Sequence, residues 1–208
     1  MPILRNYAEN IVKIRRYNEY LVDEATDEYL EETLLRGLII GYGTLREKED
    51  VVISLEMLDE YLPLIDNWMI CDTFCNTFKI ASFPEYREEV LNHIIFFLQF
   101  GSEYAERTAF ILYLNQLLKY DSDGNKLNRL KTVTLKDIES TDRESAMLDK
   151  FLPFALKDLD GRFYSQMGAA WFLAEAFNVY PDKIWPLLKS GKNMGVDKKT
   201  YSLTLRKI

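Results

Sequence analysis

The chain has 208 residues, of which 48% are hydrophobic and 13% aromatic, and its formal net charge is −7. This length and composition fit a globular domain with a continuous core, and they exclude a disordered chain. The N-terminal stretch has no apolar run typical of a signal peptide, and no segment reaches the roughly 18 apolar residues that a membrane span needs. We therefore expect a cytoplasmic protein that does not enter a membrane.

Helical periodicity dominates the chain. Residues 28–40, for example, carry leucines at three- and four-residue spacing, as an amphipathic helix requires. In chain order, the periodicity predicts helices over residues 4–20, 27–42, 48–61, 63–79, 84–99, 102–119, 126–138, 142–158, 162–178 and 181–190, and a final one near 197–207. The β-branched stretch VVISL (51–55) could also form a strand, but it has no hairpin partner, so we predict that it is helical.

Capping and breaking residues mark the predicted helix ends. Ser102 can cap a helix N-terminus, and Thr141 with Glu144 fits a capping box. First helical turns are predicted at Pro63, Pro84 and Pro153, and breaks between helices at Gly101, Gly124 and Gly161. The stretch DSDGN (121–125) begins like a calcium-binding loop, but its glycine comes too early and no acid closes it, so we predict a turn.

The order of these helices predicts an all-α fold, either a bundle or a solenoid of antiparallel helix pairs. The stretch LDEYLPLI (58–65) recurs as LDKFLPFA (148–155), 90 residues later. Two repeats of roughly 45 residues would give this spacing, which is typical of HEAT-like helix pairs. We therefore predict one HEAT-like α-solenoid domain over residues 1–208, with a concave face.

The scarcity of cysteine and histidine limits the possible chemistry. Cys71 and Cys75 are the only cysteines and lie one turn apart on one predicted helix, where a disulfide would constrain almost nothing. We expect buried, reduced thiols there. His93 is the only histidine, so neither a zinc site nor most imidazole-dependent mechanisms are expected. Without a metal or organic cofactor, carboxylates, arginines, aromatic rings or hydroxyls would have to carry any reaction.

Charge is distributed unevenly along the chain. Residues 19–60 contain thirteen acidic residues and three basic ones, whereas residues 183–208 contain seven basic residues and one acidic one. Together with NKLNRLK (125–131), the C-terminal segment could form a local basic surface on an acidic protein.

The stretch DNWMICDTFC (66–75) places Asp72 one helical turn after Trp68, and both residues fall at the rim of the predicted apolar face. The second copy of the repeat has Asp158 and Arg162 at the equivalent positions, so the repeat itself does not require this pair. The alternative is that Trp68 belongs to the core and Asp72 pairs with a nearby base.

Two further positions are candidates for binding. Arg107 lies in the core-forming stretch ERTAFILYL, where a carboxylate or phosphate partner would explain a long cation. Glu103, four residues earlier, is the alternative partner. Trp171 follows three small residues at 168–170, which allow another backbone or a ligand to approach closely.

In their order and spacing, the motifs DNWMICDTFC, ERTAFILYL and FYSQMGAAWFLAEAF…YPDKIWPLLK resemble the DNA alkylation repair family of HEAT-like (AlkD-like) glycosylases. The stretch YLEETLLRGLIIGY extends this resemblance over nearly the whole chain. Members of that family are all-helical solenoids whose concave face holds DNA. They excise cationic N3- and N7-alkylated purines without a metal or an organic cofactor. The resemblance implies that Asp72 is the catalytic aspartate, that Trp68 and Trp171 are cleft tryptophans, and that Arg107 is the cleft arginine.

The reaction suits these residue types. An alkylated purine is a cationic leaving group, and positive charge develops on the deoxyribose as the glycosidic bond lengthens. A carboxylate can stabilise that charge and orient water, while tryptophan faces attract cations. We therefore expect a monomeric DNA-alkylpurine N-glycosylase acting on double-stranded DNA that contains alkylated purines. The alternative is a non-catalytic HEAT-like module that binds DNA or a protein partner, which the acidic net charge favours.

Overall fold

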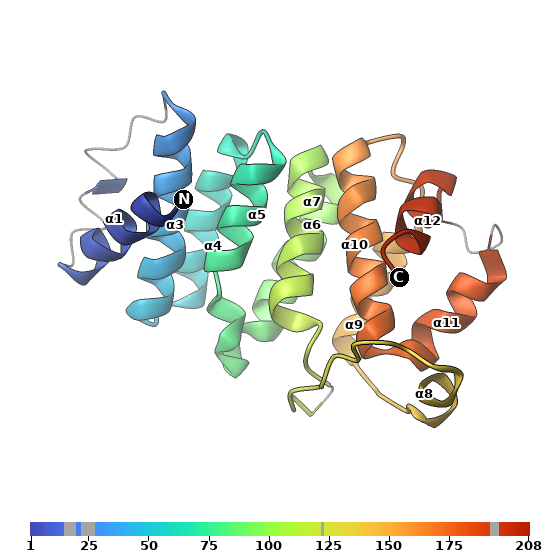
Figure 1. Cartoon of the computed structure of the whole chain (residues 1–208). Helices are drawn as coiled ribbons and strands as arrows, with labels where there is room; N and C mark the ends of the chain where they lie inside the picture. Colours follow the sequence, from blue (N-terminus) through green and yellow to red (C-terminus); the bar gives the residue numbers. More distant parts are fainter. Residues whose placement is uncertain (15–19, 22–27, 122, 192–195) are drawn as a thin grey trace. The chain divides into compact units, whose positions relative to one another are not determined.

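The structure of the chain is a computed structural model, and it describes residues 1–14, 20–21, 28–121, 123–191 and 196–208 (Figure 1). Within these ranges the long elements are α1 (Pro2–Lys13), α3 (Leu30–Arg46), α4 (Val51–Tyr61), α5 (Trp68–Thr77), α6 (Arg87–Phe100), α7 (Glu103–Leu112), α8 (Leu135–Ser140), α9 (Ala146–Leu156), α10 (Phe163–Val179), α11 (Pro181–Ser190) and α12 (Lys198–Leu205). Short 3-10 turns lie at Leu62–Leu64, Ile80–Ser82 and Pro84–Tyr86, and a π-helical turn at Tyr113–Leu117 extends α7. Extended pairing in the described residues is limited to an isolated bridge between Tyr120 and Lys126. The all-α prediction is therefore confirmed.

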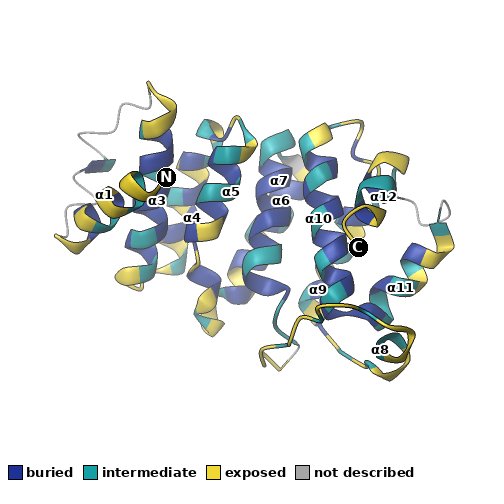
Figure 2. Cartoon of the chain, in the orientation of Figure 1, coloured by how far each residue is buried: buried dark blue, intermediate teal, exposed yellow. Residues whose placement is uncertain are grey.

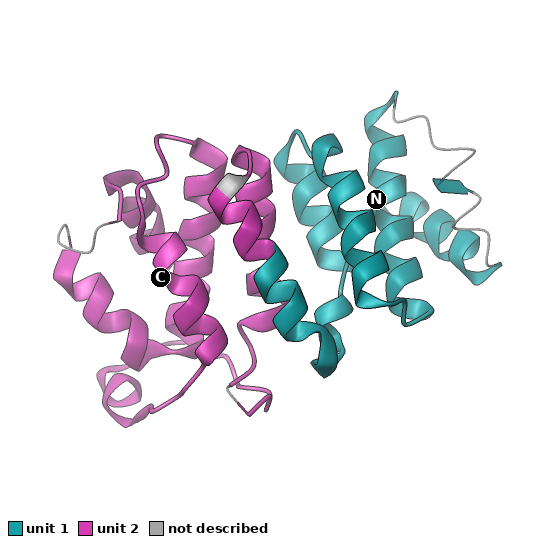
Figure 3. Cartoon of the chain, turned by 180° about the vertical axis from the view of Figure 1, so that it is seen from behind, with its two compact units in different colours: residues 1–93 teal, residues 94–208 magenta. Residues whose placement is uncertain are grey.

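The chain divides into two compact units, which are described separately below (Figure 3). Unit 1 comprises residues 1–93 and unit 2 residues 94–208, so the division falls within α6. The prediction of a single domain over the whole chain stays a prediction. Among the described residues, no helix combines the length and the apolar character that a membrane crossing requires.

Unit 1 is built around α3, which packs against α1, α4 and α5. Two glycines on α3 allow close contacts. A Cβ atom at Gly37 would lie 2.4 Å from the hydroxyl oxygen of Tyr61, and one at Gly41 would lie 2.8 Å from the backbone nitrogen of Phe78. The Tyr61 hydroxyl donates to the Thr33 carbonyl at 2.8 Å, which satisfies a polar group in the core of unit 1.

Unit 2 is built around α10, which packs against α7, α9, α11 and α12 (Figure 1). The facing sides of α7 and α10 are buried (Figure 2). A cluster of buried rings fills the centre of unit 2 and consists of Phe110, Tyr113, Phe151 and Phe172. The rings of Tyr113 and Phe151 stack at a centroid distance of 4.1 Å, a geometry that stabilises beyond the area buried.

Helices α7 and α10 run in the same direction. Near the start of α7, Glu103 Oε1 accepts a hydrogen bond from the Tyr164 backbone N–H at 2.6 Å. Two turns further along, Phe110 meets Phe172 at a centroid distance of 6.2 Å. Because the numbers of the contacting residues increase together along the two helices, α7 and α10 are parallel.

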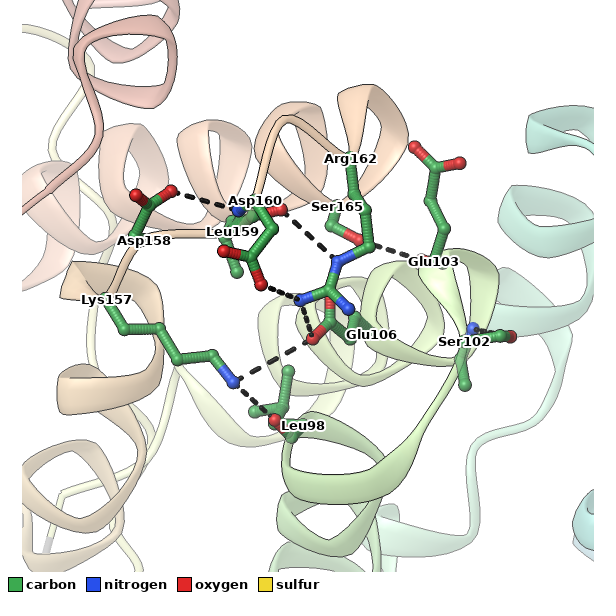
Figure 4. Close-up of polar contacts among 11 residues, drawn as sticks. Leu98, Ser102, Glu103, Glu106, Lys157, Asp158, Leu159, Asp160, Arg162 and Ser165 are labelled. Atoms are coloured by element: carbon green, nitrogen blue, oxygen red, sulfur yellow. Dashed lines mark hydrogen bonds and ion pairs between the residues drawn. The ribbon is translucent and has the colours of Figure 1, made fainter.

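The loop between α9 and α10 is fastened to α7 by a buried carboxylate (Figure 4). The side chain of Glu106 is 3% exposed, and its Oε1 lies 3.0 Å from a guanidinium nitrogen of Arg162 and 3.8 Å from Lys157 Nζ. Lys157 Nζ also donates to the Leu98 carbonyl at 2.5 Å. Within the loop, Asp160 and Gly161 both have positive φ angles, of 52° and 74°, which makes a tight turn between the two cations.

Several local predictions are confirmed. VVISL lies in α4, Ser102 caps α7 by accepting from the Ala105 N–H, and Asp121 closes the predicted turn by accepting from the Asn125 N–H. The two copies of the short repeat are buried alike: Leu58, Tyr61 and Ile65 match Leu148, Phe151 and Ala155.

Three predictions about helix ends are wrong. The predicted helix over 126–138 is reduced to α8, because the preceding segment makes backbone hydrogen bonds elsewhere: the Leu127 N–H donates to Lys119 O and the Leu130 N–H to Asn178 O. Thr141 follows α8 instead of starting a helix, and the capping box lies at Thr134 with Asp137. Ser145 caps α9, so Pro153 lies inside that helix and not in its first turn.

Other boundaries shift by a few residues. The predicted helix 63–79 begins only at Trp68, because Asn67 caps it after an extended residue at Ile65. The first predicted helix, 4–20, is observed as α1 up to Lys13, and its residues 15–19 lie outside the described ranges.

Candidate functional site

Helix α5 carries the predicted pair Trp68 and Asp72. The Asn67 side chain caps the helix by accepting from the N–H groups of Met69 and Ile70 at 3.0 and 3.1 Å. This cap fixes Trp68 as the first helical residue, where its side chain is 54% exposed. Asp72 follows one turn later on the same side and is partly buried. An indole and a carboxylate thus lie side by side on the surface of unit 1.

The adjoining face of α5 belongs to the core. Cys71 and Cys75 are fully buried and neither forms a disulfide, as predicted from their spacing. Phe74 and Phe78 stack behind them at a centroid distance of 4.9 Å. Because these side chains anchor the helix, the orientation of Trp68 and Asp72 is set by packing and not by a loop.

A hollow of about 460 Å³ lies in unit 1 beside the start of α5. Its lining includes Tyr29 and Thr33 from the N-terminal end of α3 and Asp66, Asn67 and Ile70 from the start of α5. Trp68 and Asp72 are not among its lining residues. The pair therefore lies beside this hollow and not inside it.

Arg107 is deeply placed in unit 2. Its side chain is 5% exposed, and its guanidinium donates to the Tyr164 carbonyl at 3.4 Å. Gly168 lies against the same residue, since a Cβ atom there would be 3.4 Å from the Arg107 Cα. The small residue predicted to allow a close approach thus admits the backbone of α7, and Arg107 helps to join α7 to the first turn of α10.

Trp171 lies on α10 and is partly buried. The ammonium nitrogen of Lys207 lies over its ring, 5.4 Å from the centroid. A cation therefore already occupies a face of this indole, as expected from the attraction between ammonium groups and aromatic rings. Sequence patterns did not point to Lys207, whose partner lies 36 residues away along the chain.

The four predicted residues are divided between the units. Trp68 and Asp72 meet on α5 in unit 1, and Arg107 and Trp171 lie on the packed pair α7 and α10 in unit 2. Their assembly into one cleft stays a prediction.

Two basic residues of the predicted basic segments form ion pairs with acidic residues in unit 2. Arg129 makes two hydrogen bonds to Glu175, at 2.5 and 2.9 Å, and these raise the pKa of the guanidinium. Lys183 Nζ lies 3.0 Å from an Asp149 carboxylate oxygen and 3.2 Å from one of Glu144. Partial burial acts to lower the pKa of Lys183, but the hydrogen bonds to the two carboxylates outweigh it, and the pKa is raised. The pairing reduces the positive charge that these segments can offer to DNA.

Among the described residues, no group of three or more histidine, cysteine, aspartate or glutamate side chains is arranged to hold a metal ion. No family model, curated protein or solved structure matches the chain. The resemblance to the alkylation repair family therefore stays a prediction that rests on the sequence motifs.

Proposed function

We propose that the protein is a DNA glycosylase that excises cationic N3- or N7-alkylated purines from double-stranded DNA. The observation that carries the proposal is the exposed indole of Trp68 one turn before the Asp72 carboxylate, on a helix fixed by its cap and its buried face. An exposed aromatic ring beside an anion is suited to a flat cation next to a sugar on which positive charge develops.

The proposed reaction breaks the bond between C1′ of the deoxyribose and the alkylated purine nitrogen. The bonding electron pair leaves with the base, which becomes neutral, so little acid assistance is needed. Asp72 stabilises the oxocarbenium-like sugar and orients the water whose oxygen bonds to C1′. The water proton passes to the carboxylate or to solvent. No metal or organic cofactor enters this sequence.

In the proposal, Trp171 and Arg107 complete the substrate cleft, as the resemblance implies. Each of these residues already has a contact in unit 2 that must open before it can bind the substrate. Trp171 can receive a cationic base only on a face that Lys207 has left, since two cations at one ring repel each other. Arg107 can reach a phosphate only if its hydrogen bond to the Tyr164 carbonyl opens. Trp68 and Asp72 therefore carry more of the proposal than the other two.

We also propose that the helices stack as HEAT-like pairs with a concave DNA-binding face. In such a solenoid, equivalent helices of successive pairs run parallel. The parallel contact of α7 with α10 supports this arrangement within unit 2, as does the matching burial of the two repeat copies.

The test is base release from methylated DNA. Purified protein is incubated with duplex DNA carrying N7-methylguanine or N3-methyladenine, and the free base is measured by chromatography. We expect release by the wild-type protein and a loss of about 10²-fold or more in Asp72→Asn, because the carboxylate charge acts mainly in the transition state.

Asp66→Asn is the matched control, because it makes the same change six residues earlier, at an exposed position on the same cap. It should release base at the wild-type rate, and both variants should keep the wild-type helical signal. Absence of release by the wild-type protein, or equal rates for the wild type and Asp72→Asn, would overturn the proposal.

A non-catalytic module that binds DNA or a protein is the second candidate. The pairing of Arg129 and Lys183 with carboxylates favours it, because it leaves less free positive charge for a duplex on a protein of net charge −7. This candidate predicts no base release by any variant.

A further inference from the structure

Two aromatic rings of α10 each carry a lysine from the C-terminal segment. Lys207 Nζ lies 5.4 Å from the centre of the Trp171 ring, and Lys199 Nζ lies 5.8 Å from the centre of the Phe163 ring. The Phe163 side chain is 46% exposed, so its ring faces solvent as well as the lysine. Each pair combines a flat apolar face with a positive charge.

The two pairs are in register along α10 and the C-terminal segment, in which Lys199 lies on α12 and Lys207 just after it. Phe163 and Trp171 are eight residues apart, and so are Lys199 and Lys207, with both numbers increasing in the same direction. Eight helical residues span about 12 Å, so the pairs form a row and not a single point. Helices α10 and α12 pack against each other, and Gln166 of α10 donates to Asp197 Oδ1 at 3.2 Å, at the cap of α12.

The α12 side of this surface is rich in positive charge. Residues 198–208 include no acidic residue and four basic ones, Lys198, Lys199, Arg206 and Lys207. All four basic residues are exposed. The only acid of residues 183–208, Asp197, is engaged in capping α12, where it accepts from the N–H groups of Lys199 and Thr200.

We propose that this face of α10 and α12 binds single-stranded DNA. The nucleobases stack on Phe163 and Trp171, and the phosphates pair with the four basic side chains of residues 198–208. Alternating rings and positive charges are the composition of single-strand binding surfaces, because unpaired bases expose their faces while the backbone stays anionic. A duplex hides its base faces in the stack and could use only the positive charge. An acidic protein segment could likewise pair with the lysines but would leave the rings unused.

The position of the two lysines over the rings is compatible with this role. A lysine arm is long and flexible, so the ammonium can move from the ring to a neighbouring phosphate when a base takes its place. The inference goes beyond the proposed glycosylase, since it involves no alkylated base and no bond cleavage, and it shares only Trp171 with the proposed cleft. It can hold or fail independently of base release.

The test is fluorescence anisotropy with a labelled oligothymidylate of about 12 nucleotides, within the usual site sizes, at about 50 mM salt. We expect the wild-type protein to bind this strand, and we expect the aromatic face of Phe163 to contribute to binding of the strand but not of a duplex of the same length. The variant Lys199→Gln/Lys207→Gln should bind at least about tenfold more weakly. Its plot of log affinity against log salt should be shallower by about 1.4, which corresponds to two lost phosphate contacts on a single strand.

The matched control is Lys136→Gln/Lys189→Gln, which makes the same change of charge at two exposed positions of α8 and α11. It should bind like the wild-type protein. Phe163→Leu tests stacking separately, because it keeps the apolar volume and removes the aromatic face, and we expect about fivefold weaker binding with an unchanged salt slope. Urea midpoints check that each variant is folded.

Four results would overturn the inference. The first three are the absence of strand binding by the wild-type protein at about 50 mM salt, equal affinities of the two double variants for the strand, and equal weakening of strand and duplex binding by Phe163→Leu. Tighter binding of a ribo-oligonucleotide than of the matching deoxy strand would also reject it, since the surface would then select RNA.

Discussion

The carboxylate of Glu106 is almost completely buried, whereas its partners Arg162 and Lys157 are 34% and 36% exposed. Its second oxygen, Oε2, has no hydrogen-bond partner among the described residues. Removing the carboxylate and removing a cation of this cluster should therefore have unequal effects on stability. A buried anion without its partner is costly, whereas a partly exposed cation can be hydrated.

We predict that Arg162→Met lowers the free energy of unfolding by about 2–3 kcal/mol, and Glu106→Met by less than about 1 kcal/mol. The double variant should recover most of the loss caused by Arg162→Met, since it removes the stranded anion. Urea unfolding of all four proteins measures the cycle. Equal losses for the two single variants would contradict the unequal burial on which the prediction depends.

Tyr104 gives a prediction about alkaline pH. Partial burial, assisted by the hydroxyl group of Tyr164, whose ring stacks on that of Tyr104 at 5.1 Å, raises the pKa of Tyr104 to about 12. The neutral phenol is thus favoured in the folded protein, while the unfolded chain ionises near its ordinary value of 10. The stability contributed by this difference is complete below pH 10 and is lost as the pH rises towards 12.

The comparison with Tyr104→Phe isolates this effect from the other tyrosines. We expect the difference in urea midpoint between the wild-type protein and the variant to be constant below pH 10 and to move in favour of the variant between pH 10 and about 12. A difference that stays the same across this range would show that Tyr104 titrates normally.

For single residues, a helical wheel was sufficient where the side chain lies on a regular helix. It predicted Cys71 and Cys75 inside and Trp68 at the rim, as observed. It could not predict that Arg107 is buried against Tyr164, because that bond joins residues 57 positions apart. It missed the lysine on Trp171 for the same reason.

At the scale of elements, the approach of α3 to α5 depends on the absence of a side chain at Gly41. A Cβ atom there would lie 2.7 Å from Thr77 Oγ1 and 2.8 Å from the Phe78 backbone nitrogen. We predict that Gly41→Ala lowers the free energy of unfolding by about 1–3 kcal/mol, even though alanine favours the helix, since backbone atoms cannot move aside cheaply.

Gly168→Ala is the matched variant in unit 2. The nearest atoms to a Cβ there are 3.4 Å away, which is close to an ordinary contact. Because the helix gains up to about 1 kcal/mol from alanine, we expect a neutral or slightly stabilising effect. Urea midpoints compare the two variants, and a larger loss for Gly168→Ala than for Gly41→Ala would reject the contact argument.

The predicted elements show where periodicity succeeds and where it does not. The predicted helix over residues 181–190 forms α11 over that range. Residues 126–134 have apolar spacing that also fits a helix, but their backbone donors bond to Lys119 and Asn178, which only the folded chain brings near. Competing caps account for the error near Thr141, since Ser145 offers a better-placed hydroxyl.

For the whole molecule, the separation of charge along the chain predicts salt-sensitive association. Residues 19–60 are strongly acidic and residues 183–208 strongly basic. Opposite charges on two molecules attract over about 30 Å at an ionic strength of about 10 mM, but over only about 8 Å at about 150 mM.

We therefore predict reversible self-association near neutral pH at low ionic strength and a monomer at physiological ionic strength. Light scattering coupled to size-exclusion chromatography measures the mass under both conditions. Lys199→Gln/Lys207→Gln should weaken the association, whereas association that strengthens with salt would indicate an apolar contact instead.

The positions of the three tryptophans have a practical consequence for following the molecule in solution. Trp68 is the single tryptophan of unit 1, and Trp171 and Trp185 both belong to unit 2. The tryptophan emission of a Trp68→Phe protein therefore comes only from residues 94–208, and that of a Trp171→Phe/Trp185→Phe protein only from residues 1–93, provided that excitation selects tryptophan over the 13 tyrosines. Recording denaturation of these two proteins by intrinsic fluorescence gives a separate unfolding curve for each unit without any attached dye, and two coincident curves would identify the whole chain as one cooperative folding unit.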